Sequence, residues 1–437
     1  MPQEIEELPP PPAKSAISEL VHFARTHSPF YRSLYRDLPS HIVNLEDLPL
    51  TNNDDYWKAS NGETNEVLTA PFIDGIILRS GGSSNIPKTV LMTRAEFHTS
   101  AHINSVMMAE ANELLPGDRV ANLAVHGGLY SGFITYHYAV MNCPIPIVNL
   151  PISGNEPIDS IIKSIIKHKA TVIICTVYNS TRLAEYLQGE KLSLPDVRRI
   201  LYSGENFYTD LRDLHRAVFP NAKIRPLGYG SVELKFFGFP IIRHGDDEDA
   251  DVNPIYKVQT ASVIMEIVDG DGLVIKENGK RGTVVGTNLF MRLQPKIRYP
   301  LGDAAEWVDY DAGLFRFRGR VSVGLKIANA QLSLQSLRKI VTGVLGRGNM
   351  VTYQVVVSRS DRKNVVAIRI AAEKPENSEE LRTRIEDEIM ELSPAWRLRR
   401  DEGRIAPLQL EWVAFNDLVR VQSGKLKEIV EKRYRES

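Results

Sequence analysis

The sequence predicts an α/β protein with a large N-terminal α/β domain, which holds parallel sheets and a small β region, and a smaller α+β C-terminal domain. Three observations support this prediction. Strand-like and helix-like segments alternate in the middle of the chain, as in parallel βαβ units. Short strands separated by Asp-Gly and Asn-Gly turns follow, which indicates antiparallel pairing. After residue 319 the pattern changes again, and what remains has the size of an ordinary domain.

Composition excludes several classes of protein. The chain has 437 residues, 43% of them hydrophobic, which is enough for a large buried core. Its 53 Lys and Arg residues balance 54 Asp and Glu residues, so we expect no nucleic-acid or membrane partner. Residues 1–14 are acidic and proline-rich, lack the parts of a signal peptide, and predict a flexible tail. Cys143 and Cys175 are interpreted as buried small side chains in a reducing, cytoplasmic setting.

The predicted parallel sheet uses apolar runs at residues 119–125, 145–150, 171–177, 197–202 and 222–228. The run at 171–177 is continuous and β-branched, as expected for a strand buried on both faces. Before it, isoleucines recur at helical spacing, and Pro157 suits the first turn of that helix. These isoleucines are Ile158, Ile161, Ile162, Ile165 and Ile166.

Glycine turns follow three of these runs, at His126-Gly127-Gly128, Ser203-Gly204 and Gly228-Tyr229-Gly230. Ligands of open α/β sheets bind beyond the carboxyl ends of the strands, so the turns predict one shared cleft. Each turn alone is equally well explained as a plain tight turn.

The C-terminal third has its own pattern. Residues 260–320 predict antiparallel strands, and residues 353–358 and 364–371 predict a hairpin. An amphipathic helix follows, whose apolar face consists of Leu381, Ile385, Ile389 and Leu392. A strand at 408–414 comes after this helix.

Residues 80–88 read Ser-Gly-Gly-Ser-Ser-Asn-Ile-Pro-Lys and follow the apolar run at 76–78. Glycines let backbone N–H groups converge on an anion, and Lys88 adds a charge suited to phosphate. A flexible linker is the alternative, but the loop has an apolar segment on each side. The loop therefore predicts a phosphate site.

From this loop onward the sequence resembles the adenylate-forming (ANL) superfamily. Five motifs are similar to those of the family and occur in the same order. They are Ser80 to Lys88, Tyr229-Gly230-Ser231-Val232-Glu233, Tyr299-Pro300-Leu301-Gly302-Asp303, Gly319-Arg320 and Ser423-Gly424-Lys425. The phenylacetate–CoA ligase branch is the most similar. Its motifs resemble His27-Ser28-Pro29-Phe30-Tyr31-Arg32, Leu48-Pro49-Leu50-Thr51, Gly127-Gly128-Leu129-Tyr130-Ser131-Gly132 and Ser153-Gly154-Asn155.

The resemblance implies an AMP-binding domain at 15–319, a mobile C-terminal lid at 320–437, and ATP and Mg²⁺ as cofactors. Asp303 would bind the ribose, Glu233 would hold Mg²⁺, and Lys425 would be the catalytic lysine. The remaining ATP-binding residues would be Ser80, Gly81, Gly82, Ser83, Ser84, Lys88, Tyr229, Gly230, Ser231 and Arg320. Tyr229 would stack on adenine. Plain structural explanations stay open, such as a basic surface tail for Lys425.

The acyl pocket is expected at the first strand end, with His126, Tyr130 and Phe133, and at Gly204 and Glu205. The reaction implied is ATP-dependent adenylation of a carboxylic acid, expected to be aryl or arylacetic, with release of pyrophosphate. Acyl transfer to CoA would follow.

Three departures from the family pattern keep alternatives open: Pro300, Val321-Ser322 and Ala328-Asn329. The last replaces a segment that helps CoA ligases form the thioester. The acyl-adenylate would then pass to an amine or a carrier protein. A non-catalytic nucleotide-binding relative is the third alternative, and a homodimer is one option for the oligomeric state.

Overall fold

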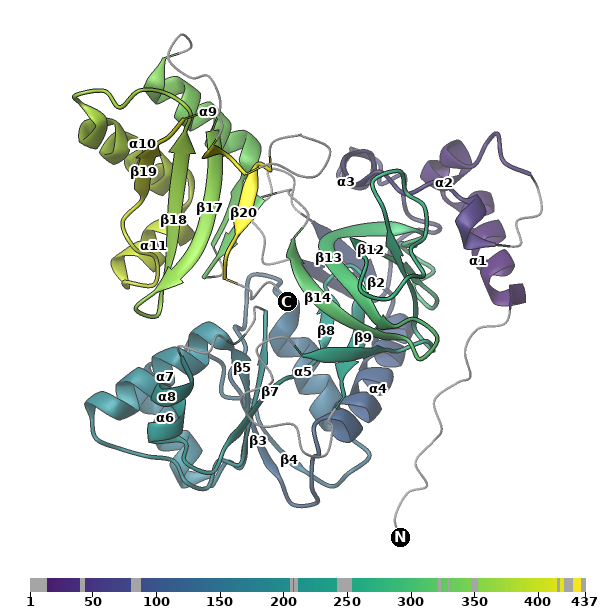
Figure 1. Cartoon of the computed structure of the whole chain (residues 1–437). Coiled ribbons are helices and arrows are strands. Elements are labelled where there is room, and N and C mark those ends of the chain that lie inside the picture. Colours follow the sequence, from purple (N-terminus) through teal and green to yellow (C-terminus); the bar gives the residue numbers. More distant parts are fainter. Residues whose placement is uncertain are drawn as a thin grey trace. The chain divides into compact units, whose positions relative to one another are not determined.

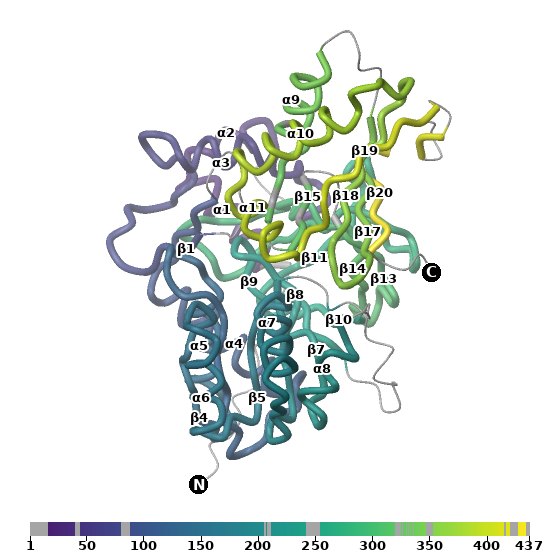
Figure 2. Tube along the Cα trace, turned by 90° about the vertical axis from the view of Figure 1, so that its left-hand side faces the viewer, coloured from purple at the N-terminus to yellow at the C-terminus, as the bar shows by residue number. Residues whose placement is uncertain are grey.

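The computed structural model describes residues 14–39, 44–79, 88–204, 207, 211–241, 254–320, 324–328, 330–346, 353–414, 417–419 and 427–433. The chain divides into two compact units, which are described separately (Figures 1 and 2). Unit 1 comprises Met1–Gly81 and Ile86–Arg318, and unit 2 comprises Gly82–Asn85 and Gly319–Ser437. The predicted tail lies outside the described residues except for Lys14, where the first helix begins.

A five-stranded sheet in the order β4-β3-β5-β6-β7 forms one part of unit 1. All four neighbouring pairs are parallel, which confirms the predicted βαβ pattern. Its strands are β3 (Arg119–Asn122), β4 (Val148–Leu150), β5 (Val172–Thr176), β6 (Arg199–Ser203) and β7 (Lys223–Pro226).

Helices cover both faces of this sheet, as β5 shows. Ile173 and Cys175 pack with α6, α7 and α8, whereas Val172 and Ile174 pack with α4 and α5 (Figure 1). Because successive side chains of a strand point to opposite faces, a continuous apolar run serves both cores. The helices are α4 (Arg94–Ala111), α5 (Ser131–Met141), α6 (Ile158–Lys167), α7 (Val177–Gly189) and α8 (Arg212–Val218).

The isoleucine-rich helix is α6, and one of its residues differs from the prediction. Ile161, Ile162 and Ile165 are buried, but Ile166 is 54% exposed. The buried stripe runs through Ile161 and Ile165, and Ile166 is turned by about 100° from Ile165 at 3.6 residues per turn.

A second sheet has seven strands in the order β11-β12-β13-β14-β10-β9-β8. The pairs β11–β12, β12–β13, β10–β14, β9–β10 and β8–β9 are antiparallel, which confirms the pattern predicted for 260–320. Its strands are β8 (Tyr229–Ser231), β9 (Lys235–Pro240), β10 (Ile255–Val258), β11 (Val263–Val268), β12 (Arg281–Asn288), β13 (Tyr299–Asp309) and β14 (Leu314–Arg320).

The N-terminal segment packs against this second sheet. Its elements are α1 (Lys14–His27), α2 (Pro29–Leu34), the 3-10 helix η1 (Leu45–Asp47), α3 (Asn53–Ser60) and the hairpin of β1 (Ile76–Arg79) with β2 (Thr89–Met92). Tyr31 and Tyr56 donate hydrogen bonds to the carbonyl oxygen of Pro295 at 3.1 and 2.9 Å. Thr51 donates to the carbonyl oxygen of Ile297 at 2.6 Å. These bonds fix α2 and α3 to the segment that leads into β13.

Unit 2 has a four-stranded sheet in the order β19-β18-β17-β20 and a short hairpin of β15 and β16. The predicted hairpin is confirmed as β17 and β18. The elements are β15 (Gly324–Ile327), β16 (Ala330–Ser333), α9 (Leu334–Leu345), β17 (Tyr353–Ser360), β18 (Lys363–Ile370), α10 (Ser378–Leu392), α11 (Pro394–Asp401), β19 (Gln409–Trp412) and β20 (Ile429–Glu431).

The predicted amphipathic helix of unit 2 is α10, and three of its four predicted apolar residues are buried, namely Leu381, Ile385 and Ile389. Leu392 is 52% exposed, because α10 ends at this residue and the chain turns into α11 at Pro394. No helix in the described part of either unit is both long enough and apolar enough to span a bilayer.

Candidate active site

The loop predicted to hold phosphate joins the two strands of the β1–β2 hairpin. These strands pair antiparallel, with Arg79 opposite Thr89, so the apolar segments on both sides of the loop are confirmed as strands. The predicted residues Ser80, Gly81, Gly82, Ser83 and Ser84 lie outside the described residues. The last residue of the loop, Lys88, is described and immediately precedes β2.

Lys88 pairs with Glu233, the residue predicted to hold the metal. The distance from Nζ of Lys88 to Oε1 of Glu233 is 3.2 Å, and their side chains are 25% and 8% exposed. The Lys88 ammonium also donates to the hydroxyl oxygen of Tyr299 at 3.5 Å. The fold therefore brings together two candidates that lie far apart in the sequence.

Glu233 lies in the turn between β8 and β9, and Gly230 is required for the shape of that turn. The register shifts between Tyr229 and Gly230. A Cβ atom on Gly230 would lie 2.4 Å from the carbonyl oxygen of Lys235, closer than any side chain allows. The Ser231 hydroxyl accepts a hydrogen bond from the backbone N–H of Leu234 at 3.1 Å. Gly230 and Ser231 thus shape the turn that presents Glu233.

Tyr229 and Asp303, predicted to contact adenine and ribose, are directly linked. The Tyr229 hydroxyl donates to Oδ2 of Asp303 at 2.7 Å. Both residues are largely buried, at 9% and 8% exposure. The Tyr229 ring packs edge-on against Phe237 and Phe315, with centroids 5.1 and 5.3 Å away.

Sequence reasoning missed two buried lysines, Lys235 and Lys296, whose charges interact with that of Glu233. Lys235 is 6% exposed, and its Nζ has no hydrogen-bond partner among the described residues. Burial lowers the pKa of Lys235 to about 7, and the nearby Glu233 and Glu96 oppose that shift. Lys296 is fully buried, and burial lowers its pKa well below the usual range, again opposed chiefly by Glu233. Lysines are so seldom buried that no sequence signal suggested either one.

The residues predicted for the acyl pocket lie just beyond β3. The rings of His126 and Phe133 meet edge to face with centroids 4.7 Å apart. The turn between them has left-handed backbone at Gly127, Gly128 and Leu129, which explains both glycines. His126 and Phe133 of the predicted aromatic group therefore contact each other beyond the carboxyl end of β3.

A contact that sequence reasoning missed joins Leu129 and Tyr130 to β1. The backbone N–H of Arg79, the last residue of β1, donates to the carbonyl oxygen of Leu129 at 2.7 Å. The Arg79 guanidinium donates to the Tyr130 hydroxyl at 3.2 Å and lies 5.1 Å from the centre of that ring. Arg79, the residue that precedes the loop, thus lies beside Tyr130 of the predicted acyl pocket.

Other predicted residues are placed less fully. Gly204 is exposed, has left-handed backbone and directly follows β6, whereas Glu205 lies outside the described residues. Arg320 ends β14, and Lys425 falls in a segment that is not described.

Comparison with known proteins identifies the fold. No protein family and no curated protein matches the sequence. The chain is similar to a crystal structure of 2-hydroxyisobutyryl-CoA ligase in complex with 2-HIB-AMP and CoA. That match has a TM-score of 0.68 and 18% identity and covers 98% of this chain and 95% of the other. The chain has the fold of this 2-hydroxyisobutyryl-CoA ligase.

Further solved structures have a similar fold. A postadenylation structure of the same ligase with 2-HIB-AMP has a TM-score of 0.61 at 17% identity, over 99% of this chain and 95% of the other. IdnL1 has a TM-score of 0.50 at 17% identity, over 79% and 68% of the two chains. At these identities the matches show the fold alone.

The resemblance of the sequence motifs implies Mg²⁺, and the Glu233 carboxylate is the candidate ligand for it. Within the described part of the chain, no three His, Cys, Asp or Glu side chains gather as a metal site. Mg²⁺, however, is commonly held by one or two carboxylates together with substrate phosphates. Glu233 supplies such a carboxylate 3.2 Å from Lys88, a residue suited to the same phosphates.

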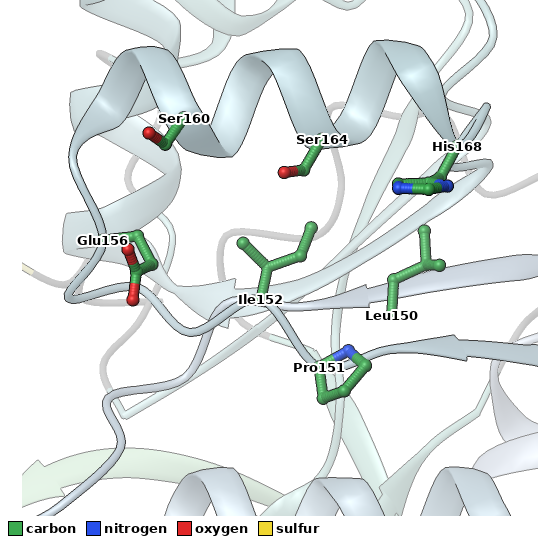
Figure 3. A pocket seen from close by; sticks show the side chains of 7 residues that line it. All are labelled: Leu150, Pro151, Ile152, Glu156, Ser160, Ser164 and His168. Carbon is green, nitrogen blue, oxygen red and sulfur yellow. The ribbon is translucent and has the colours of Figure 1, made fainter.

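Two further features of unit 1 lie apart from these candidates. A groove of about 360 Å³ lies beside α6, and its lining includes none of the predicted site residues (Figure 3). It is lined by Leu150, Pro151, Ile152, Glu156, Ser160, Ser164 and His168.

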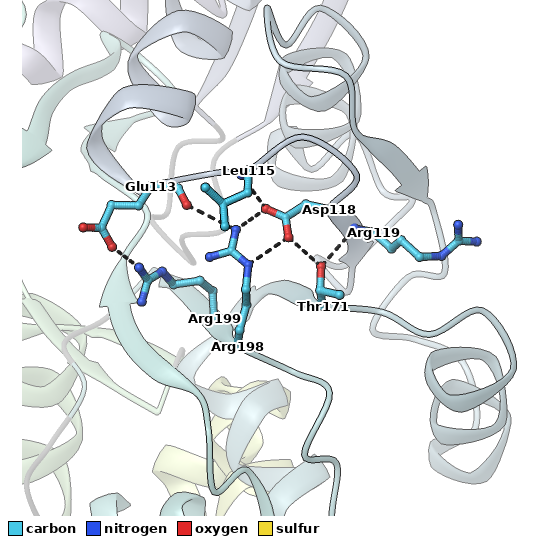
Figure 4. Close-up of polar contacts among 7 residues, drawn as sticks. All are labelled: Glu113, Leu115, Asp118, Arg119, Thr171, Arg198 and Arg199. Atoms are coloured by element: carbon cyan, nitrogen blue, oxygen red, sulfur yellow. Dashed lines mark hydrogen bonds and ion pairs between the residues drawn. The ribbon is translucent and has the colours of Figure 1, made fainter.

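The other feature is a polar network around Asp118 (Figure 4). Asp118, Thr171 and Arg198 immediately precede β3, β5 and β6, so the network lies at the amino ends of the strands. In an open α/β sheet, ligands bind at the opposite, carboxyl ends. We therefore assign the network to stability.

Proposed function

We propose that this protein activates a carboxylic acid with ATP to form an acyl-adenylate and pyrophosphate. The observation that carries the proposal is the partly buried pair of Lys88 and Glu233, 3.2 Å apart. A cation and a carboxylate at one end of a Ser/Gly-rich loop suit a magnesium-bound triphosphate. The adenylate-forming fold supports the same reading.

The nucleotide is proposed to bind at candidate residues from four of the motifs. The loop residues Ser80 to Ser84 and Lys88 would hold the β- and γ-phosphates. Tyr229, with Gly230 and Ser231, would form the adenine site, and Asp303 would accept hydrogen bonds from the ribose hydroxyls. Arg320 would contact the ribose or a phosphate. Bound Mg²⁺ would neutralise charge on the phosphates at Glu233.

In the proposed reaction, a carboxylate oxygen of the acid attacks the α-phosphorus of ATP. A bond forms between that oxygen and phosphorus, the bond to the bridging oxygen breaks, and pyrophosphate leaves with the electron pair. Negative charge accumulates on the phosphoryl oxygens, so a positioned cation lowers the barrier. We assign this role to Lys425 from the family resemblance.

The acid is proposed to be aryl or arylacetic, as in phenylacetate–CoA ligases. Support comes from the edge-to-face rings of His126 and Phe133 with Tyr130 nearby, since aromatic side chains favour such contacts. Gly204 and Glu205 would complete this pocket. CoA is the proposed acceptor, because the similar 2-hydroxyisobutyryl-CoA ligase was crystallised with an acyl-AMP and CoA.

A hydroxylamine-trapping screen of aromatic and aliphatic acids with ATP and Mg²⁺ tests the proposal. We expect hydroxamate from at least one aryl or arylacetic acid, and its loss in Lys425→Ala. Lys427→Ala is the matched control, because it removes a neighbouring lysine outside the motif. Unchanged hydroxamate in Lys425→Ala would refute the catalytic assignment, and no product from any acid would refute adenylation.

The acceptor is tested separately, by measuring AMP release from the preferred acid with and without CoA. CoA-dependent AMP release is expected. Release that requires an amine or a carrier protein instead would refute CoA as the acceptor while leaving adenylation intact.

A further inference from the structure

The partners of the Lys88 ammonium include two aromatic residues that the motifs do not assign to the site. Besides Glu233, Nζ of Lys88 contacts the Tyr299 hydroxyl at 3.5 Å and lies 5.9 Å from the centre of the Trp57 ring. Trp57 belongs to α3, lies outside the motifs, and is only 2% exposed. Tyr299 is fully buried at the start of β13.

Trp57 and Tyr299 are joined to each other. The indole N–H of Trp57 donates to the Tyr299 hydroxyl oxygen at 2.8 Å, in a buried bond. An indole N–H can only donate, and an ammonium can only donate. The Tyr299 oxygen therefore accepts from both Trp57 and Lys88. The bond from Trp57 fixes how the hydroxyl is oriented and leaves an acceptor lone pair for the ammonium.

The ring of Trp57 also faces the buried Lys296, whose Nζ lies 5.6 Å from the Trp57 ring centre and 4.9 Å from that of Tyr56. Nζ of Lys296 donates a hydrogen bond to the carbonyl oxygen of Gln294 at 3.0 Å. The Tyr56 hydroxyl donates to the carbonyl oxygen of Pro295 at 2.9 Å. These hydrogen bonds fix the groups that surround the Trp57 ring.

We propose that Trp57 and Tyr299 are positioning residues that hold the Lys88 ammonium at Glu233 for the phosphates of ATP. The inference rests on the proposed function of Lys88. It extends that site to α3, whose Trp57 acts through Tyr299 and not by touching the nucleotide. A buried hydrogen bond that holds the Lys88 side chain in place lowers the entropy lost when ATP binds. Removing this hydrogen bond therefore weakens the binding of ATP.

Equilibrium binding of the α,β-methylene analogue of ATP with Mg²⁺, measured by calorimetry, tests the inference without knowledge of the acid. Trp57→Phe keeps a ring but removes the indole donor. Tyr299→Phe removes only the hydroxyl. Each is expected to raise Kd about fivefold, the value of one ordinary hydrogen bond. Neither is expected to change Kd further in a Lys88→Met background, because Lys88 is the group they position.

Trp307→Phe is the matched control for Trp57→Phe. Trp307 is 3% exposed, belongs to the same hydrophobic core, and donates its indole N–H to the carbonyl oxygen of Ile275 at 2.9 Å. We expect it to lower the melting temperature but leave Kd unchanged.

Three results would overturn the inference. Trp57→Phe and Tyr299→Phe could raise Kd as much in the Lys88→Met background as in the wild type, which would show a general structural effect. They could leave Kd unchanged although Lys88→Met raises it, so that the inference fails while the proposed function stands. Finally, Lys88→Met itself could leave Kd unchanged, in which case the assignment of Lys88 and the inference fail together.

Discussion

Replacing Asp118 by asparagine is expected to destabilise unit 1 without affecting the candidate site. The Asp118 carboxylate accepts hydrogen bonds from the backbone N–H of Leu115 at 2.7 Å and from the Thr171 hydroxyl at 2.7 Å. It also forms a two-pronged contact with Arg198, with Nε at 2.9 Å and a second bond from Nη2 (Figure 4). The Asp118 side chain is 4% exposed.

The magnitude follows from these bonds. Asparagine keeps one acceptor oxygen but turns a donating NH₂ group toward donors, so about two bonds are lost, at least one of them charge-assisted. Charge-assisted bonds contribute roughly 1.5–3 kcal/mol and neutral ones roughly 0.5–1.5 kcal/mol. We therefore expect the free energy of unfolding to fall by about 2–4 kcal/mol. Asp159→Asn is the control, because the exposed pair of Asp159 and Lys163 should contribute under about 1 kcal/mol.

Urea unfolding followed by circular dichroism at several pH values measures this loss. Burial alone raises the pKa of Asp118, but hydrogen bonds from Arg198, Leu115 and Thr171 outweigh it, and the pKa is lowered. A lowered folded-state pKa gives stability that is present above the unfolded-state value of about 4 and lost as pH falls through the folded value. The difference between wild type and Asp118→Asn should therefore shrink below about pH 4. A loss no larger than that of Asp159→Asn at pH 7, or one that grows toward acid pH, would refute this reasoning.

Three other substitutions test the account. Tyr229→Phe removes the donor to Asp303, so we expect a stability loss of about 1 kcal/mol by thermal unfolding and weaker binding of the ATP analogue; unchanged binding would count against the nucleotide role of this pair. Lys235→Met should raise the melting temperature, because it replaces a buried ammonium without a partner among the described residues, while the exposed Lys280→Met should not; a lower melting temperature for Lys235→Met would contradict this. Gly154→Ala places Cβ 2.1 Å from Nδ2 of Asn179 and should lower the free energy of unfolding by about 2 kcal/mol or more. Gly189→Ala is the control, because its Cβ would meet no atom within 4 Å. Equal melting temperatures of the two variants would be inconsistent with this packing.

Much of the fold was predictable because buried positions recur at regular spacings in helices and strands, so apolar residues recur at the same spacings in the sequence. The continuous run that forms β5 indicated a strand with helices on both faces, as observed. Periodicity fails at helix ends, where it cannot tell which residue still faces the core. Ile166 and Leu392 lie in the last turns of α6 and α10 and are exposed, although the pattern placed them on the buried faces.

The site was predictable only as separate motifs. Lys88 and Glu233 were each predicted from local patterns, but only the fold shows that they pair, and the sequence contains no sign of that distance. Trp57 looks like an ordinary core aromatic, and Tyr299 stood in a motif without a role of its own. Their contacts with Lys88 depend on how α3 packs near β13. Lys235 and Lys296 were missed because a lysine in a sequence is normally taken as exposed.

Acid-dependent exchange of labelled pyrophosphate into ATP tests the central claim most directly, because it reports formation of the acyl-adenylate whatever the final acceptor. With the preferred acid and Mg²⁺, we expect label to enter ATP only when the acid is present. Glu233→Gln and Lys425→Ala should reduce the rate by at least about tenfold. Exchange that is absent with every acid tested, or that persists unchanged in both variants, would contradict the account.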